Sequence, residues 1–376
     1  MQMINASVGD GGTNKPADTA LVQALLVKIQ RPAGSAGLPG PYLDSYDGDC
    51  GDHTKKAIRA FQADHVFVNA ARTQSVPNPN ATAGQVKPND ATWVQLLAKV
   101  PPEFKDLRVL PGGKTVYLQA AANELQAKLS ALATLTFTLP FRAKVQRCIN
   151  RMHELYGIAV GVCPKGDRRD FQTQYALFLQ GPGITSAGPG ESNHNYGMAT
   201  DMGFAGLRWL HANGGVDHDE TPWLHHLTAQ SAAKALVFWE ALRTVGTSAA
   251  VGAFRGPLTD RPHVQNWDDS NVTMGTRLAA LLQLAGTMKW SFAQSRYHCD
   301  LGLGGAKLNV GTAAQIWNLN ATLTPVALTQ ARNAAAAAQN KPVPAAATDA
   351  DVATMCQLLR RQFELADARW QDWTPH

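Results

Sequence analysis

The sequence lacks the features that mark a membrane protein, a cysteine-based scaffold or a nucleic-acid-binding tail. No apolar run reaches the ~18 residues that a membrane span requires. The net charge is +5, but no block of Lys and Arg is long enough to indicate a nucleic-acid tail. None of the five cysteines lies in a CxxC pair, so we expect mostly reduced thiols and no cysteine-rich zinc site. The first residues, MQMINASVGDGG, have neither the basic region nor the apolar core of a signal peptide, and we expect none.

The composition is that of an ordinary soluble protein with more than one domain. Of the 376 residues, 45% are hydrophobic and 17% are charged, which is enough apolar material for roughly two or three domains. A mildly basic surface would suit an anionic polymer such as a bacterial wall, although charge alone does not identify the partner. We divide the chain into segments 1–100, 101–135, 136–305 and 306–376, and we expect an α+β fold.

The first hundred residues predict a small helical unit. KPADTALVQALLVKI is predicted to be a helix with Asp18 at its N-cap and these residues on one face: Leu21, Val22, Leu25, Leu26 and Ile29. A turn at 47–48 precedes a second helix that faces inward through Ala57, Ile58 and Phe61. A third turn and helix repeat this pattern with Thr92, Trp93, Leu96 and Leu97.

The later segments mix helices with short strands. KTVYLQAAANELQAKLSALA is predicted to be a long alanine-rich helix, either a linker or the first helix of the next domain. FRAKVQRCINRMHELYG predicts an amphipathic helix ending at Gly157, and IAVGV predicts a buried strand. ARNAAAAAQNKPVPAAAT is low in complexity and predicts an exposed connector. The final amphipathic helix carries Met355, Leu358, Leu359 and Phe363, with Leu365 and Ala366 extending its apolar side.

A candidate metal site begins in ESNHNYGMATDMGF, where His194 and Asp201 stand seven residues apart. Two ligands on one helix turn would be three or four apart, so this spacing suits a loop residue followed by a strand residue. Gly197 permits a tight turn between them. The strand alternates, which places Asp201 on the face opposite Met202 and Phe204.

The third ligand candidate lies in LTDRPHVQNW. His263 follows a proline, and Asp260 precedes it by three residues, near enough to act on a metal-bound water. Two histidines and one carboxylate leave a fourth position open, which is the arrangement of a catalytic zinc rather than a structural one. Ser192 is expected to be structural, because no His/Asp pair is spaced to activate it.

Each of these residues has a simpler alternative role. His194 could cap a loop, Asp201 and Asp260 could form turns, and Arg169 could be a surface residue or bind a neighbouring acid. A rival cluster lies in the insertion HANGGVDHDETPWLHH (211–226), whose alternative is a solvated polar loop: it offers His211, Asp217, His218, Asp219, His225 and His226. DSYDGDCGD lacks the order of a calcium loop and is rejected as one.

The first segment resembles a peptidoglycan-binding domain of the three-helix type. The resemblance covers VGDGGTNKPADTALVQALL, DGDCGDHTKKAIRAFQ and GQVKPNDATWVQLL, about a quarter of the chain. The family's D-G-x-x-G-x-x-T…A-I-x-x-F-Q pattern falls on Asp47, Gly48, Gly51, Thr54, Ala57, Ile58, Phe61 and Gln62. An insertion at 67–84 departs from the usual short version. The alternative is a small helical core whose Phe and Leu residues only pack.

The middle segment resembles the zinc D-Ala-D-Ala carboxypeptidase and L-alanyl-D-glutamate peptidase family. Its S-x-H-x-x-G-x-A-x-D signature falls on Ser192, His194, Gly197, Ala199 and Asp201, and Asp260-x-x-His263 resembles its second motif. RRDFQTQYALFLQG is similar to a further family stretch, at Arg169, Gln174, Phe178 and Gly181. Endolysins of the family commonly carry Asp in the second motif, where carboxypeptidases and dipeptidases more often carry Glu.

The resemblance implies a zinc peptidase domain with a small antiparallel sheet flanked by helices, followed by a helical extension of unknown role. Zinc would be held by His194, Asp201 and His263, with Asp260 as general base and Arg169 on the oxyanion. Candidate substrate contacts are Gln174, Tyr196, Phe254 and Gln265. The W-G-G-x-W segment of many endolysins is missing, and Phe254 stands in that region.

The implied activity is cleavage of an amide bond in the peptidoglycan stem peptide. Asp260, which is typical of the endolysins, favours the bond between L-Ala and D-Glu. A D,D-carboxypeptidase, a cross-link endopeptidase and a non-catalytic wall-binding protein remain alternatives. Bacterial peptidoglycan is the expected partner, with no nucleic acid and no membrane span. Without a signal peptide, the protein would reach the periplasm by phage lysis or by a secretion system. The setting is either a phage endolysin or an antibacterial effector with secretion-machine or immunity partners.

Overall fold

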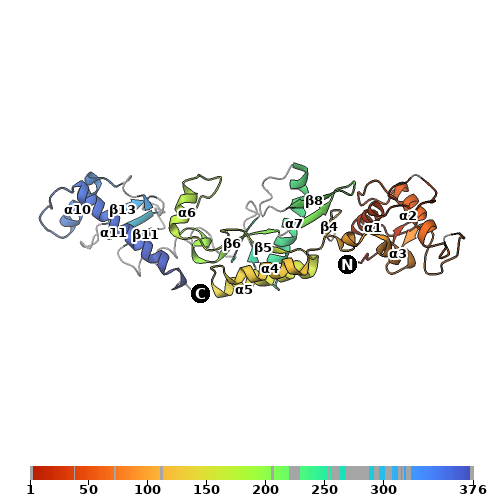
Figure 1. Cartoon of the computed structure of the whole chain (residues 1–376). Coiled ribbons are helices and arrows are strands. Elements are labelled where there is room, and N and C mark those ends of the chain that lie inside the picture. The colour runs from red at the N-terminus through yellow and green to blue at the C-terminus, as the bar shows by residue number, and fades with distance from the viewer. Residues whose placement is uncertain are drawn as a thin grey trace. The chain divides into compact units, whose positions relative to one another are not determined.

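The computed structural model of the chain is a mixed α+β structure with small antiparallel sheets, in agreement with the predicted fold class (Figure 1). It describes residues 3–37, 39–71, 73–110, 113–204, 207–219, 229–252, 254–255, 262–266, 288–291, 296–300, 307–311, 315, 317–318 and 323–372. No helix in these ranges is long and apolar enough to cross a membrane.

The helices and strands alternate irregularly along the chain. The helices are α1 (Pro16–Lys28), α2 (Asp52–His65), α3 (Ala91–Lys99), α4 (Ala122–Ala133), α5 (Leu139–Tyr156), α6 (Phe171–Phe178), α7 (Ala229–Gly246), α10 (Pro325–Ala338) and α11 (Asp349–Ala368), with short 3-10 helices η1 (Pro102–Phe104), η2 (Asn193–Tyr196) and η5 (Trp370–Asp372). The strands are β1 (Val8–Gly9), β2 (Gln85–Val86), β3 (Leu107–Val109), β4 (Val116–Leu118), β5 (Val160–Val162), β6 (Ala199–Phe204), β7 (Leu207–Leu210), β8 (Val216–Asp219), β9 (Phe254–Arg255), β10 (His263–Asn266), β11 (Met288–Ser291), β12 (Arg296–Asp300) and β13 (Lys307–Gly311). They form sheets in the orders β1-β2, β3-β4-β7-β8, β5-β6-β10-β9 and β11-β12-β13.

The chain divides into two compact units that are each discontinuous in sequence. Unit 1 contains Met1–Ala131, Gln146–Gly161 and Gly203–Val245, and unit 2 contains Leu132–Val145, Val162–Met202 and Gly246–His376. This division runs differently from the predicted segments, because unit 1 continues past residue 100 and takes in two later stretches. The predicted metal ligands all fall in unit 2.

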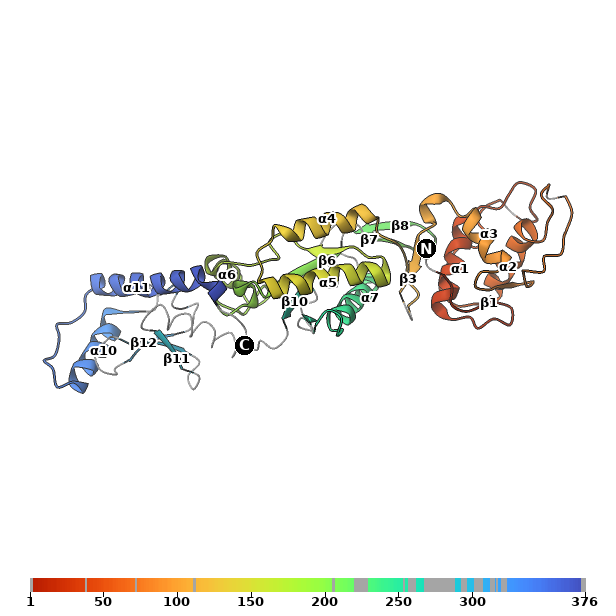
Figure 2. The same ribbon diagram turned by 90° about the horizontal axis from the view of Figure 1, so that it is seen from below.

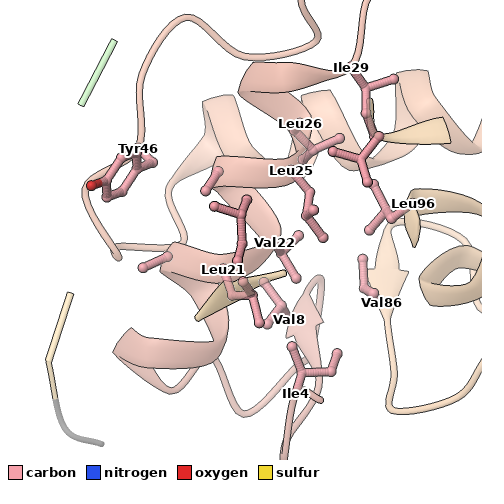
Figure 3. Packing of buried hydrophobic residues seen from close by; sticks show 14 of the residues in the cluster. Ile4, Val8, Leu21, Val22, Leu25, Leu26, Ile29, Tyr46, Val86 and Leu96 are labelled. Carbon is pink, nitrogen blue, oxygen red and sulfur yellow. The ribbon is translucent and has the colours of Figure 1, made fainter. Parts of the chain in front are cut away.

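The core of unit 1 is built around α1, in which every residue from Asp18 to Val27 is buried and not only one face. Figure 3 shows Leu21, Val22, Leu25 and Leu26 of this helix in the cluster that also contains Val8 and Val86. Asp18 is not the N-cap as predicted: Lys15 holds that position, and Pro16 opens the helix. The Asp18 carboxylate instead accepts hydrogen bonds from the backbone of Asn5 and Ala6, both at 3.0 Å. The inward faces predicted for α2 and α3 are confirmed at Ala57, Ile58, Phe61, Trp93 and Leu96.

The same core extends beyond residue 100. Side chains of β3, β4 and β7 belong to it, at Leu107, Val109, Val116, Leu118 and Leu210. The prediction of one long helix across KTVYLQAAANELQAKLSALA is wrong in its first part, where β4 forms and only the part from Ala122 is helical. The β-branched and aromatic residues of β4 are buried and pair with β3 and β7, which outweighs the helical tendency of the alanines beside them.

The core of unit 2 joins η2 and α6 to the C-terminal helices. Figure 2 shows α6 beside the C-terminal end of α11. The stretch predicted as an exposed connector is helical up to Ala338, in α10, with Ala335 and Ala336 buried. The predicted amphipathic helix is confirmed as α11, but Leu358 and Leu365 are exposed and its buried face is Val352, Cys356, Leu359, Phe363 and Ala366. Of the cysteines, Cys148, Cys163 and Cys356 are buried and Cys50 is half-buried.

Candidate metal centre

Two of the predicted ligands face each other across a pair of antiparallel strands. Asp201 lies in the middle of β6, and His263 is the first residue of β10. The register pairs Asp201 directly with His263. Directly opposed residues have Cβ atoms only about 4.5–5.5 Å apart, so the pairing itself brings the carboxylate and the imidazole together.

The third ligand stands on a short turn that precedes β6. His194 lies in η2, whose N-cap is Ser192; the Ser192 hydroxyl accepts a hydrogen bond from the backbone of His194 at 3.3 Å. Asn195 completes a capping box, and the turn ends at Gly197, where φ is +61°. This left-handed conformation is one that glycine adopts without steric cost. The loop-then-strand arrangement predicted from the seven-residue spacing is confirmed, and the observed cap gives Ser192 a structural role.

The ligand atoms of the three residues converge on one point. His194 Nε2 lies 3.4 Å from Asp201 Oδ1 and 3.1 Å from His263 Nδ1, and His263 Nδ1 lies 3.3 Å from Asp201 Oδ1. A tetrahedral zinc ion with bonds of about 2.0–2.1 Å holds its ligand atoms roughly 3.3 Å apart. The observed separations match that value. Within the described residues, this is the only group of three such side chains close enough to hold a metal ion.

The other polar atom of each ligand also has a partner. His194 Nδ1 lies 3.0 Å from the carbonyl oxygen of Asp167, and His263 Nε2 lies 2.9 Å from Gln265 Oε1. Arg169 donates a hydrogen bond to Asp201 Oδ2. Outer partners of this kind orient metal ligands and fix the histidine tautomers. The set therefore resembles a prepared metal centre more than a chance meeting of polar side chains.

The protonation states suit a cation. Burial disfavours the charged form of Asp201, but its contacts with His194 and His263 and the charge of Arg169 hold the pKa of its carboxyl well below its usual range. Burial lowers the pKa of His194, against the opposing influence of Asp201. At neutral pH the site thus presents one carboxylate and a neutral imidazole at His194, which is the form that binds metal.

The turn that carries His194 is bound to the segment 167–169. Arg169 donates its backbone N–H to the carbonyl of His194 at 3.2 Å, and Asn195 Nδ2 donates to the carbonyl of Arg169 at 2.9 Å. Arg168 Nε donates to the carbonyl of Asn195 at 3.2 Å. Three hydrogen bonds therefore fix the turn that carries His194 to this one short stretch of chain.

The C-terminal helix supports this stretch. The Asp367 carboxylate pairs with Arg168 and accepts the backbone N–H of Phe171 at 3.2 Å. Arg168 lies over the ring of Trp370, with its guanidinium carbon 4.9 Å from the ring centroid. The segment of unknown role, 306–376, thus contributes residues that touch the loop next to the metal ligands.

The remaining predicted site residues lie in different surroundings. Gln174 is fully buried on α6, and its Nε2 donates to the carbonyl of Ala187 at 2.9 Å. Tyr196 is fully buried in the unit 2 core, and its hydroxyl donates to the carbonyl of Gly190 at 2.7 Å. Both therefore contact the loop before His194. Only the backbone of Phe254 is described, in β9, and Asp260 lies outside the described residues.

The rival cluster is only partly visible. The backbone of His211 closes a turn, donating to the carbonyl of Gly215 at 2.7 Å, and residues 217–219 lie in β8. The other members of that cluster lie outside the described residues.

The sequence reasoning missed several supporting residues, which include Asp167, Arg168, Asn193 and Asp367. Nothing local identifies Asp367, which stands 199 residues after Arg168. Gln265, by contrast, follows His263 by two residues in a strand, and that spacing alone places both side chains on one face.

No protein-family model matches the chain, and no curated protein matches it either. The assignment therefore depends on the residues of the site and their geometry.

Proposed function

We propose that the protein is a zinc-dependent peptidoglycan hydrolase that cleaves an amide bond within the stem peptide, between L-Ala and D-Glu. The observation that carries the proposal is the convergence of His194, Asp201 and His263 at separations of 3.1–3.4 Å, in the order and spacing of the peptidase signature. A bound zinc ion would supply a Lewis acid that polarises the scissile carbonyl and acidifies an attacking water.

The chain's own residues would bind the metal, stabilise charge and transfer the proton. Asp201 and the two histidines would hold the metal, and their outer partners would keep the ligand atoms turned towards it. Arg169 is ion-paired with Asp201 at the edge of the site, where it holds the carboxylate and places positive charge near a developing oxyanion. Asp260, three residues before His263, is the general base in this proposal and returns its proton to the leaving amine.

Unit 1, through residues 1–100, would hold the enzyme on its insoluble substrate. It contains a cavity of about 420 Å³ beside the 67–84 insertion, lined by Arg59, Phe67, Thr73, Gln74 and Gly84 among others. We assign the polymer contact to this open pocket because its lining places the ring of Phe67 beside polar side chains such as Arg59 and Gln74. The substitution Gln74→Trp, which places an indole in this cavity, should weaken co-sedimentation with purified sacculi. Val94→Trp, at an exposed position of α3, is the control.

Mass spectrometry of muropeptides after digestion tests the activity. The proposal predicts free disaccharide-L-Ala together with a peptide that begins at D-Glu. Release of single D-Ala residues would identify a carboxypeptidase instead, and cleavage between stems would identify a cross-link endopeptidase. No cleavage by the zinc-loaded protein would leave only a wall-binding role.

A further inference from the structure

Gln265 shares a strand face with His263. The two residues are separated by one position in β10, so their side chains project from the same side of the sheet. Gln265 Oε1 lies 2.9 Å from His263 Nε2, and it also accepts a hydrogen bond from Asn193 Nδ2 at 3.0 Å. Asn193 immediately precedes His194 in η2. One amide oxygen therefore links the two histidine-bearing elements.

The chemistry of this contact restricts His263. An amide oxygen only accepts hydrogen bonds, so His263 Nε2 must carry the hydrogen that it shares with Gln265. A neutral imidazole then has a free lone pair on Nδ1 alone. Nδ1 is the atom that lies 3.3 Å from Asp201 Oδ1 and 3.1 Å from His194 Nε2, facing the metal position.

We propose that Gln265 is the positioning residue of the metal centre: it fixes the ring orientation and tautomer of His263 so that Nδ1 binds the metal, and Asn193 holds the Gln265 amide in place. The inference rests on the proposed metal site. It gives Gln265 a role different from the substrate contact expected from the sequence, because its amide oxygen is already shared by His263 and Asn193. Loss of such an outer partner typically weakens metal binding about 10–100-fold.

The test measures the Zn²⁺ dissociation constant of the full chain by competition with a chromophoric chelator. Gln265→Met keeps the size of the side chain but removes the acceptor, and it should raise the Kd about 10–100-fold. Gln265→Glu keeps an acceptor at the same place and should bind zinc at least as tightly as the parent. Gln172→Met is the matched control, because the Gln172 oxygen likewise accepts from two donors, Trp317 at 3.1 Å and Arg360 at 3.2 Å, neither of which is a metal ligand.

A second readout separates positioning from a general loss of structure. In the zinc-loaded parent, the Nε2–H proton of His263 should give a slowly exchanging downfield proton resonance, which Gln265→Met should lose and Gln265→Glu should keep. An unchanged Kd and an unchanged resonance in Gln265→Met would overturn the inference, and a raised KM alone would restore the substrate-contact role.

The possible failures can be told apart. If the parent binds no zinc, the proposed function and the inference fall together. If the parent binds zinc and Gln265→Met binds it equally well with an unchanged resonance, only the inference falls. Should Gln265→Met not fold, Gln265→Glu decides alone, and a tenfold loss of zinc affinity in that variant would refute the inference.

Discussion

Gly197→Ala should destabilise unit 2 by an amount that follows from its surroundings. Gly197 has φ +61°, and for a residue with a Cβ atom this left-handed conformation costs roughly 1–2 kcal/mol. A Cβ atom built there would lie 2.8 Å from Cζ3 of Trp370 and 3.1 Å from both the Cα of Phe137 and the backbone nitrogen of Thr138. Crowding in a packed core typically costs another ~1–3 kcal/mol, so the total is about 2–5 kcal/mol.

The neighbours of Gly197 also indicate which parts of the structure the substitution would disturb. Trp370 is almost fully buried and lies against Arg168, so its ring moves only by disturbing the segment that supports His194. The other two contacts, at Phe137 and Thr138, are backbone atoms, and Thr138 donates a hydrogen bond to the carbonyl of Gly197 at 3.0 Å. We therefore expect the substitution to weaken zinc binding as well as folding.

Gly11→Ala provides the matched control. Gly11 has φ +63°, nearly the same value, but a Cβ atom there would meet nothing within 4 Å. Its substitution should cost only the conformational ~1–2 kcal/mol. The difference between the two variants therefore isolates the crowding against Trp370 and the backbone of residues 137–138.

Native-state hydrogen exchange read by mass spectrometry is the suitable assay, because it reports the opening free energy of each unit separately. Peptides covering residues 193–202 should lose about 2–5 kcal/mol of protection in Gly197→Ala, while peptides of unit 1 stay unchanged. If Gly197→Ala costs no more than Gly11→Ala, the packing described around the metal-ligand loop is incorrect.

Three further predictions concern Asp260 as the general base, the N-terminal capping of α11 by Asp351, and the packing of residues 1–100 against the strands that follow them. Asp260→Asn should keep its zinc but lose about 10²–10⁴-fold in turnover, the usual scale of a general base; near-normal turnover would remove Asp260 from the mechanism. The Asp351 carboxylate accepts from the backbone and hydroxyl of Thr348 and pairs with Arg332, which lowers its pKa to about 2. As the pH falls, the Asp351 carboxyl is therefore protonated in the unfolded chain before it is protonated in the folded chain. Thermal stability should fall as the pH drops from about 4 towards 2, and this fall should be smaller in Asp351→Asn. Parallel pH profiles of the two proteins would contradict this. Deleting residues 1–100 should leave an insoluble or unfolded product, because β3, β4 and β7 share a core with α1; a soluble, active remainder would show instead that the first segment is an independent module.

The local elements were predictable where a short pattern decides them. The turn at Gly197, the strand through Asp201 and the helix ending at Gly157 all follow from glycine placement and periodicity, and the structure has each of them. The spacing of His194 and Asp201 also predicted a loop residue followed by a strand residue, whereas His263 was a candidate from a separate stretch, LTDRPHVQNW.

The rest depends on tertiary contacts that no local pattern reveals. Asp is a residue type that N-cap positions prefer, yet the Asp18 carboxylate accepts hydrogen bonds from backbone N–H groups twelve and thirteen residues away. Val116–Leu118 stand beside an alanine-rich run, yet pairing with β3 and β7 makes them a strand. Asp367 supports the metal-ligand loop through a contact made across 199 residues, which only the folded chain brings together.

Zinc titration of the metal-free protein is the most direct test of the central claim, that His194, Asp201 and His263 form one metal centre. The parent should bind one zinc ion per chain, and His194→Ala, Asp201→Ala and His263→Ala should each abolish tight binding. His211→Ala, in the rival cluster, should keep full stoichiometry. A parent that binds no zinc, or a ligand variant that keeps full zinc stoichiometry, would contradict the account.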